Sequence, residues 1–241
     1  MMTKPKMILF DYGQTISNEG KFNGLKGTTA VMEHAVENSR GLTPEEVQAE
    51  AENINTEMGR NNPAARAQMT YEVPNHMFTA YLYELCGLKI DLPPAEIDRV
   101  FWDASAPWTP SEGIGDFLEF LDKEGIRTAV LSNICYDPQV VKDRIQQVVP
   151  GNHFEFVVAT SEYLYRKPHK RIFDFALMKA GLKPEEVWYV GDNYVCDVEG
   201  ARGAGMTPIW YKGAIDFYQP DHDDVATITS WKELEEIIKK L

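Results

Sequence analysis

The stretch Met7-Ile8-Leu9-Phe10-Asp11 decides the fold class of this chain. Four consecutive apolar residues without polar alternation are typical of a short strand buried on both faces, and this strand ends at a carboxylate. Segments with helical spacing, such as residues 114–121, separate it from further apolar runs of the same kind. Those runs are residues 127–131, 156–159, 187–190 and 207–211. The alternation predicts an α/β fold with a parallel sheet and crossover helices.

Composition and charge exclude several classes of protein. The chain has 241 residues, of which 44% are hydrophobic and 25% charged, as in ordinary globular proteins. Its formal net charge is −13 and no cluster of Lys and Arg stands out, so we expect no nucleic-acid partner. Its three cysteines are widely spaced, and no apolar segment reaches the roughly 20 residues of a membrane span. We therefore expect a cytoplasmic protein without a membrane segment, and the sequence does not indicate an oligomeric state.

Residues 16–105 have a different hydrophobic pattern. They contain no strand-like apolar runs, and their apolar residues recur three and four positions apart. One helix start is well marked, since Thr43 and Glu46 form a capping box with Pro44 in the first turn. Further helices are expected over residues 77–85 and 97–101. The pattern predicts an all-helical insert at residues 16–105. The α/β core then consists of residues 1–15 and 106–241.

Polar side chains follow the predicted strands at the points where the strands end. They are Asp11, Ser132 with Asn133, Lys167, and Asp192 with Asp197. Ligands of open parallel sheets bind at the carboxyl ends of the strands, so we expect these side chains to lie together.

This set of residue types is suited to transfer of a phosphoryl group to an aspartate. Mg²⁺ prefers oxygen ligands and would bridge Asp11, Asp192 and a phosphoryl oxygen. Lys167 and the Ser132 hydroxyl would hold the remaining phosphoryl oxygens and offset their charge.

The order and spacing of these residues resemble the haloacid dehalogenase superfamily of hydrolases. Four segments carry the resemblance, and they follow the family's motif order along the whole chain. They are Asp11-Tyr12-Gly13-Gln14-Thr15, Leu131-Ser132-Asn133, Tyr165-Arg166-Lys167-Pro168, and Gly191-Asp192-Asn193-Tyr194-Val195-Cys196-Asp197. Each match is weak alone, and four in order are a strong signal.

The resemblance implies a Rossmann-like parallel sheet core with helices on both faces, closed by an all-α cap domain at residues 16–105. It implies a magnesium-dependent phosphatase of a small phosphorylated metabolite, in which Asp11 and Lys167 are catalytic. The implied substrate-binding residues are Thr15, Ser132, Asn133 and Lys167. The implied metal ligands are Asp11, the backbone carbonyl of Gly13, and Asp192. Asp197 is implied to lie next to these ligands without binding the metal itself. Cap closure would exclude water, and we expect the loop Gly59-Arg60-Asn61-Asn62-Pro63 with Arg66 to reach the substrate.

One departure from the family pattern bears on the activity. Phosphatases of the family carry an acid/base Asp two residues after the nucleophile, and this chain carries Gly13. Acid/base help contributes typically about 10²- to 10⁴-fold, so we expect aryl and acyl phosphates to be better substrates than sugar phosphates. Gln14 can supply a hydrogen bond there but no proton.

Several alternatives stay open at this point. The alternative role for Asn133 is the cap of the next helix. The alternative for Lys167 is a solvated charge near a helix start, although its position just before Pro168 favours the ligand role. A dehalogenase needs no acid at position 13, although Gly191-Asp192 argues against it. A phosphonatase-like hydrolase would need a cap lysine, which neither Lys21 nor Lys26 matches clearly. A phosphometabolite-binding protein with weakened turnover is the remaining alternative, and only Gly13 supports it. We expect all three cysteines to be structural.

Overall fold

The computed structural model of the protein describes residues 2–214 and 222–241, apart from the side chains at positions 63 and 67. The run Met7–Phe10 forms strand β1 inside a six-stranded sheet. The other strands are β6 (Arg127–Ser132), β7 (Val157–Ala159), β8 (Val187–Gly191), β9 (Thr207–Tyr211) and β10 (Ala226–Ile228). Their order is β10-β9-β8-β1-β6-β7, and every neighbouring pair is parallel. The five predicted strands are confirmed, and β10 is an addition.

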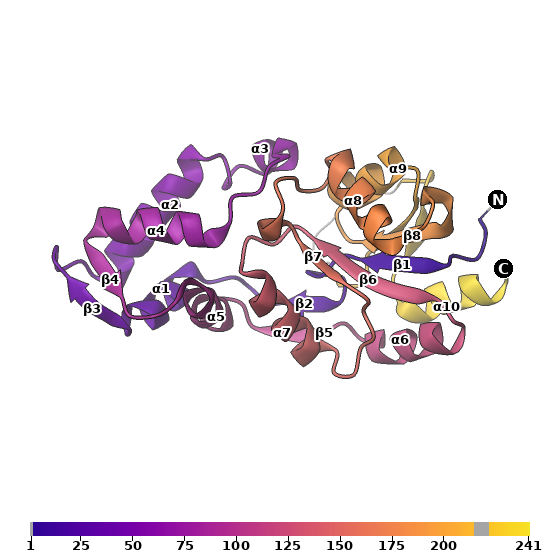
Figure 1. The fold of residues 1–241 in the computed structure, drawn as a ribbon, viewed down its shortest axis with the longest axis horizontal. Helices are drawn as coiled ribbons and strands as arrows, with labels where there is room; N and C mark the ends of the chain where they lie inside the picture. The colour runs from indigo at the N-terminus through magenta and orange to yellow at the C-terminus, as the bar shows by residue number, and fades with distance from the viewer. Residues whose placement is uncertain (1, 215–221) are drawn as a thin grey trace.

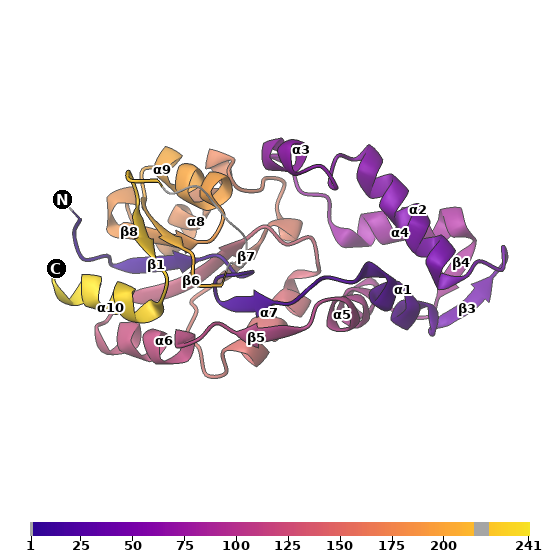
Figure 2. The same cartoon turned by 180° about the vertical axis from the view of Figure 1, so that it is seen from behind.

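Both faces of the sheet are covered, because side chains of its strands alternate between two hydrophobic clusters. In β1, Ile8 and Phe10 belong to one cluster, and Met7 and Leu9 to the other. The helices of the core are α6 (Ile114–Lys123), α7 (Pro138–Val148), α8 (Lys170–Ala180), α9 (Gly200–Gly203) and α10 (Trp231–Lys239). Helices α6, α7 and α10 complete the first cluster, and α8 and α9 complete the second. Figures 1 and 2 show α8 and α9 on one side of β1, with α6 and α10 on the other.

Short turns of 3-10 and π type connect the larger elements of the core. They are η1 (Thr160–Glu162), η2 (Pro184–Glu186) and the π-helical η3 (Tyr194–Glu199).

The insert has a hydrophobic cluster of its own, which its helices share. These helices are α1 (Gly24–Met32), α2 (Pro44–Glu57), α3 (Pro63–Gln68), α4 (Asn75–Cys86) and α5 (Pro94–Ser105). The capping box predicted for α2 is present, since Thr43 accepts the Glu46 N–H and Glu46 accepts the Thr43 N–H. Figure 1 places the insert at one end of the molecule and both chain termini at the other.

The prediction that the insert is all-helical is wrong in one detail. Strands β3 (Ala35–Asn38) and β4 (Leu88–Ile90) pair antiparallel inside it. A second antiparallel pair, β2 (Ser17–Glu19) with β5 (Trp108–Pro110), lies where the insert joins the core. These strands have three or four residues and β3 is mostly exposed, so they lack the apolar runs that reveal buried strands. The domain boundaries expected from the sequence stay a prediction.

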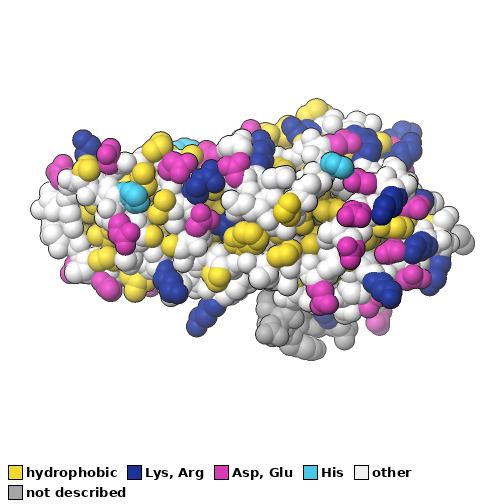
Figure 3. Space-filling view, turned by 90° about the horizontal axis from the view of Figure 1, so that it is seen from below, with side chains coloured by type: hydrophobic (Ala, Val, Ile, Leu, Met, Phe, Trp, Pro, Cys, Tyr) yellow, Lys and Arg dark blue, Asp and Glu magenta, His cyan; other side chains and the backbone are white. Residues whose placement is uncertain are grey.

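The surface drawn in Figure 3 carries a mixture of charges. Lys and Arg side chains are interspersed with Asp and Glu side chains over the core domain, and hydrophobic side chains lie in the middle of this face. No helix in the described part of the chain has the length and apolar character needed to cross a membrane.

Candidate active site

The carboxyl ends of three adjacent strands bring the predicted site residues together. Asp11 follows the central strand β1, Ser132 ends β6 on one side, and Asp192 follows β8 on the other. Ser132 Oγ donates a hydrogen bond to Asp11 Oδ1 at 2.6 Å. The geometry follows from the parallel pairing, which puts all three strand ends at one edge of the sheet.

Lys167 lies beside Asp11, although 156 residues separate them in the sequence. Its Nζ is buried and donates to Asp11 Oδ1 at 2.8 Å, Asp197 Oδ1 at 2.6 Å and the Tyr189 hydroxyl at 2.7 Å. Burial alone would lower the pKa of Lys167, but the two carboxylates outweigh it and hold the pKa well above its usual value. Lys167 is therefore a fixed positive charge beside Asp11, and the interpretation as a solvated charge is wrong.

Asn133 holds the backbone of Lys167 in place. Its Oδ1 accepts the Lys167 N–H at 2.8 Å, and its Nδ2 donates to the Lys167 carbonyl at 2.9 Å. The alternative that Asn133 caps the next helix is wrong, because the side chain of Asp137 caps α7.

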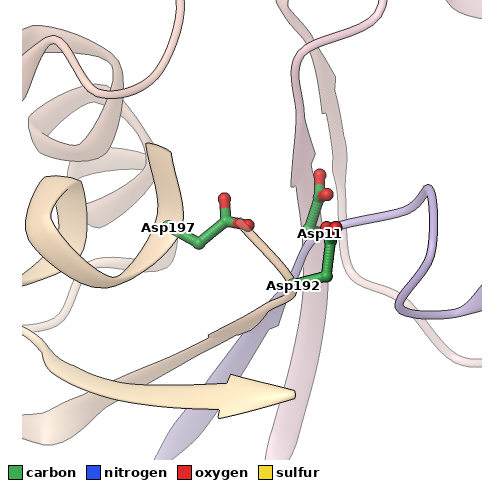
Figure 4. Close-up of side chains that lie close together, drawn as sticks. All are labelled: Asp11, Asp192 and Asp197. Atoms are coloured by element: carbon green, nitrogen blue, oxygen red, sulfur yellow. The ribbon is translucent and has the colours of Figure 1, made fainter. Parts of the chain in front are cut away.

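Three carboxylates converge at the strand ends and could hold a metal ion. Asp11, Asp192 and Asp197 each offer an oxygen, and these oxygens lie within 4.8 Å of one another. Figure 4 shows Asp11 and Asp192 side by side, with the Asp197 side chain directed toward them from η3. Burial, followed by Asp197 and Asp11, raises the pKa of Asp192 well above its usual value. Such a set of converging carboxylate oxygens fits a divalent cation such as Mg²⁺, which would offset their mutual repulsion.

Asp197 is held from two sides. Besides the bond from Lys167, its Oδ2 accepts the Asn193 N–H at 2.9 Å. Gly191 makes room for this carboxylate, because a Cβ at position 191 would overlap it. Burial raises the pKa of Asp197 to about 6, with Lys167 opposing and Asp11 adding to the shift. These contacts fix the position of the Asp197 carboxylate, and its role behind the metal ligands stays a prediction.

A cavity of about 560 Å³ opens beside Asp11. Its lining includes Asp11, Gly13, Ser132 and Asn133 from the core. The insert contributes Arg60, Asn61 and Arg66, which belong to the segment expected to reach the substrate. The cavity thus lies between the core and the insert, a kind of place where ligand pockets commonly form.

Thr15 does not join this group. Its side chain is completely buried, its Oγ1 has no hydrogen-bond partner, and it is absent from the described lining of the cavity. The structure therefore does not support the substrate-binding role that the resemblance implies for Thr15.

Glu19 lines the same cavity and was missed by the sequence analysis. The pKa of Glu19 is raised above its usual value, mainly by burial and further by the charge of Asp11. The charge of Arg144 and a hydrogen bond from Trp102 act in the opposite direction. The only signal available in the sequence was indirect, since Gly13 leaves the first motif without its second acid.

Comparison with known proteins places these observations in a family. The chain matches the family model of haloacid dehalogenase-like hydrolases over residues 5–205. It is 34% identical over 131 residues to human haloacid dehalogenase-like hydrolase domain-containing protein 3, covering 52% of this chain and 49% of that protein. It is 30% identical over 124 residues to glyceraldehyde 3-phosphate phosphatase of Pyrococcus furiosus, covering 50% of each chain. The chain thus spans about half the length of the curated relatives it matches.

A solved structure extends the likeness to the whole fold. The crystal structure of 2-haloacid dehalogenase from Pseudomonas syringae pv. Tomato is similar with a TM-score of 0.63. The match covers 100% of this chain and 99% of that chain at 18% identity, so it concerns the fold alone. With the family model matching most of the chain, the protein belongs to the haloacid dehalogenase-like hydrolases.

Proposed function

We propose that this protein is a Mg²⁺-dependent phosphatase of a small phosphorylated metabolite and acts through an aspartyl phosphate at Asp11. The arrangement around Asp11 carries the proposal. This carboxylate lies at the cavity, its Oδ1 is held by Ser132 and Lys167, and two further carboxylates lie beside it. The name of the Pyrococcus furiosus relative supports a phosphorylated substrate.

Asp11 would attack phosphorus in line with the leaving oxygen. Ser132 and Lys167, which now bond to Asp11, would donate to the phosphoryl oxygens and stabilise the charge that develops on them. Water would then hydrolyse the aspartyl phosphate and release inorganic phosphate. A bound Mg²⁺, held by Asp11, Asp192 and the Gly13 carbonyl, would supply charge neutralisation that lets two anions approach.

The alternatives have less support. A dehalogenase attacks carbon and needs no metal, which leaves the convergence of Asp11, Asp192 and Asp197 unexplained. A phosphonatase-like reaction would need a lysine from the insert, but Lys21 and Lys26 are exposed and neither is among the described residues that line the cavity. A pure binding protein would not need a nucleophile held by a lysine and a hydroxyl.

Hydrolysis of para-nitrophenyl phosphate tests the proposal directly. We expect activity that requires Mg²⁺ and is abolished by Asp11→Asn. Asp91→Asn is a matched control, because Asp91 is exposed in the insert, and it should leave the rate unchanged. Activity that persists in the Asp11→Asn variant, or none in the wild type at high enzyme concentration, would contradict the proposal.

A further inference from the structure

The cavity contains a carboxyl group that none of the steps above uses. A leaving alkoxide or phenoxide needs a proton as its bond to phosphorus breaks, and Gly13 cannot provide one. The described residues lining the cavity include three carboxylates, namely Asp11, Glu19 and Glu72.

Two of these three carboxylates are already engaged. Asp11 is bonded to Ser132 and Lys167. Glu72 accepts from Thr160 Oγ1 at 2.8 Å and from Arg166 at 3.3 Å, so it forms a buried ion pair. Glu19 interacts with Trp102 and Arg144, but its Oε1 is shielded from solvent and has no hydrogen-bond partner in the described structure. A buried oxygen without a partner is costly and is typical of a functional position.

The Glu19 carboxyl group lies next to the place of the side chain that Gly13 lacks. Its Oε2 lies 3.6 Å from the point where a Cβ of residue 13 would stand. The Glu19 carboxyl group thus reaches from β2 into the space beside Gly13, two residues after the nucleophile.

We propose that Glu19 is the general acid and base of this hydrolase, an inference that rests on the phosphatase function proposed above. As Asp11 forms its bond to phosphorus, the bond to the leaving oxygen breaks with its electron pair. The protonated Glu19 then gives that oxygen its proton. In the second step the Glu19 carboxylate takes a proton from the attacking water. The bond between phosphorus and Asp11 breaks, its electrons return to Asp11, and Glu19 is protonated again.

The surroundings of Glu19 are compatible with a protonated state. Burial is the largest influence and favours the neutral acid, and Asp11 acts in the same direction. Arg144 from α7 and Trp102 from α5 oppose it, while Tyr12 and Tyr136 stay neutral because burial raises their pKa values. These tyrosines are correspondingly poor proton donors.

Leaving-group dependence tests this assignment without relying on the natural substrate. Phenyl phosphate and para-nitrophenyl phosphate have similar shapes, but phenoxide is the poorer leaving group and needs the proton more. We expect Glu19→Gln to lower the rate on phenyl phosphate by about 10² or more and the rate on para-nitrophenyl phosphate much less. Glu37→Gln, in the exposed strand β3, is the matched control and should change neither rate.

The outcomes separate the two proposals. Loss of both rates to the same extent in Glu19→Gln, or no loss of either, would overturn the role of Glu19 while leaving the phosphatase intact. No hydrolysis of either substrate by the wild type would instead contradict the phosphatase function itself. If Glu19→Gln does not fold, Glu19→Ala gives the same comparison. If Glu19→Gln slows phenyl phosphate much more than para-nitrophenyl phosphate, the wild type has a general acid. The preference for good leaving groups expected from Gly13 would then belong to the variant and not to the wild type.

Discussion

Lys167 is the residue on which the charge balance of the site depends. All three hydrogen bonds of its Nζ go to buried oxygens, two of them on carboxylates. Removing one partner of a buried ion pair leaves the other charge uncompensated, which costs about 3–5 kcal/mol. The site therefore couples folding stability to the group that would hold the phosphoryl oxygens.

We expect Lys167→Met to lower the free energy of unfolding by about 3 kcal/mol or more and to abolish activity, because Asp11 and Asp197 lose their shared cation. Urea unfolding measures the first effect. Lys26→Met, at an exposed position of α1, is the control and should unfold like the wild type. A Lys167→Met variant as stable as the wild type would show that the pair contributes nothing to folding.

Cys135 lines the cavity, but its thiol should be unreactive at neutral pH. Burial, with a smaller contribution from Glu72, raises its pKa to about 11. Since the thiolate is the reactive form, only about a thousandth of the thiol is ionised at pH 8. We expect alkylation of Cys135 by iodoacetamide to be far slower than in the urea-unfolded chain and to accelerate toward pH 11, as followed by mass spectrometry. Equal rates in the folded and unfolded chain at pH 8 would contradict the raised pKa.

The sequence revealed those site residues that follow buried strands, and it missed contacts set by tertiary geometry. Asp11 and Asp192 stand directly after β1 and β8, so the strand pattern was enough to bring them together. The role of Asn133 as a clamp on Lys167 depends on a loop 34 residues away, which no local pattern describes. Glu19 was missed for the same reason, because its relation to Gly13 is spatial.

The turn between β1 and β2 is the element that positions Glu19. Gln14 lies in the left-handed region with φ of 54°, which is strained for a residue with a side chain. Its Nε2 donates to the Glu19 carbonyl at 2.8 Å, so the side chain ties the turn to strand β2. This bond fixes the backbone that carries Glu19. It is not the bond expected in place of the missing acid, because Gln14 is absent from the described lining of the cavity.

Two substitutions separate strain from bonding in this turn. Gln14→Ala and Gln14→Gly both lose the hydrogen bond, but only glycine relieves the left-handed strain. We therefore expect the Gly variant to be more stable than the Ala variant by about 1 kcal/mol in urea unfolding. Equal stabilities would mean that the turn changes its conformation once the side chain is removed.

At the element level, prediction succeeded where burial imposes a pattern. The core strands are buried on both faces, so their apolar runs are visible in the sequence, and Thr43 with Glu46 marked the start of α2. Strands β3 and β5 are short and largely exposed, and their pairing partners lie more than 50 and 80 residues away. Pairing between distant short segments depends on the packing of the insert, which composition does not encode.

The whole molecule carries a net charge of −13 and still brings three carboxylates together at one point, two of them buried and Asp192 half-buried. Folding must bring Asp11, Asp192 and Asp197 together, and the raised pKa of Asp192 reflects the cost of ionising it there. Clusters that function requires are commonly unfavourable for stability. Stability and metal binding should therefore be linked in this protein.

We expect Mg²⁺ to raise the unfolding temperature of the wild type relative to a sample treated with a chelator. At a concentration 100 times the dissociation constant, binding adds about 2.7 kcal/mol, or about 5 to 10 °C for a chain of this size. Asp192→Asn should remove the Mg²⁺ effect. It should also unfold at a higher temperature than the wild type without metal, because one of three converging charges is gone. Sodium chloride at equal ionic strength controls for screening of the net charge, and Asp91→Asn should respond like the wild type. The same Mg²⁺-dependent rise in wild type and Asp192→Asn would place the stabilising ion elsewhere on the acidic surface.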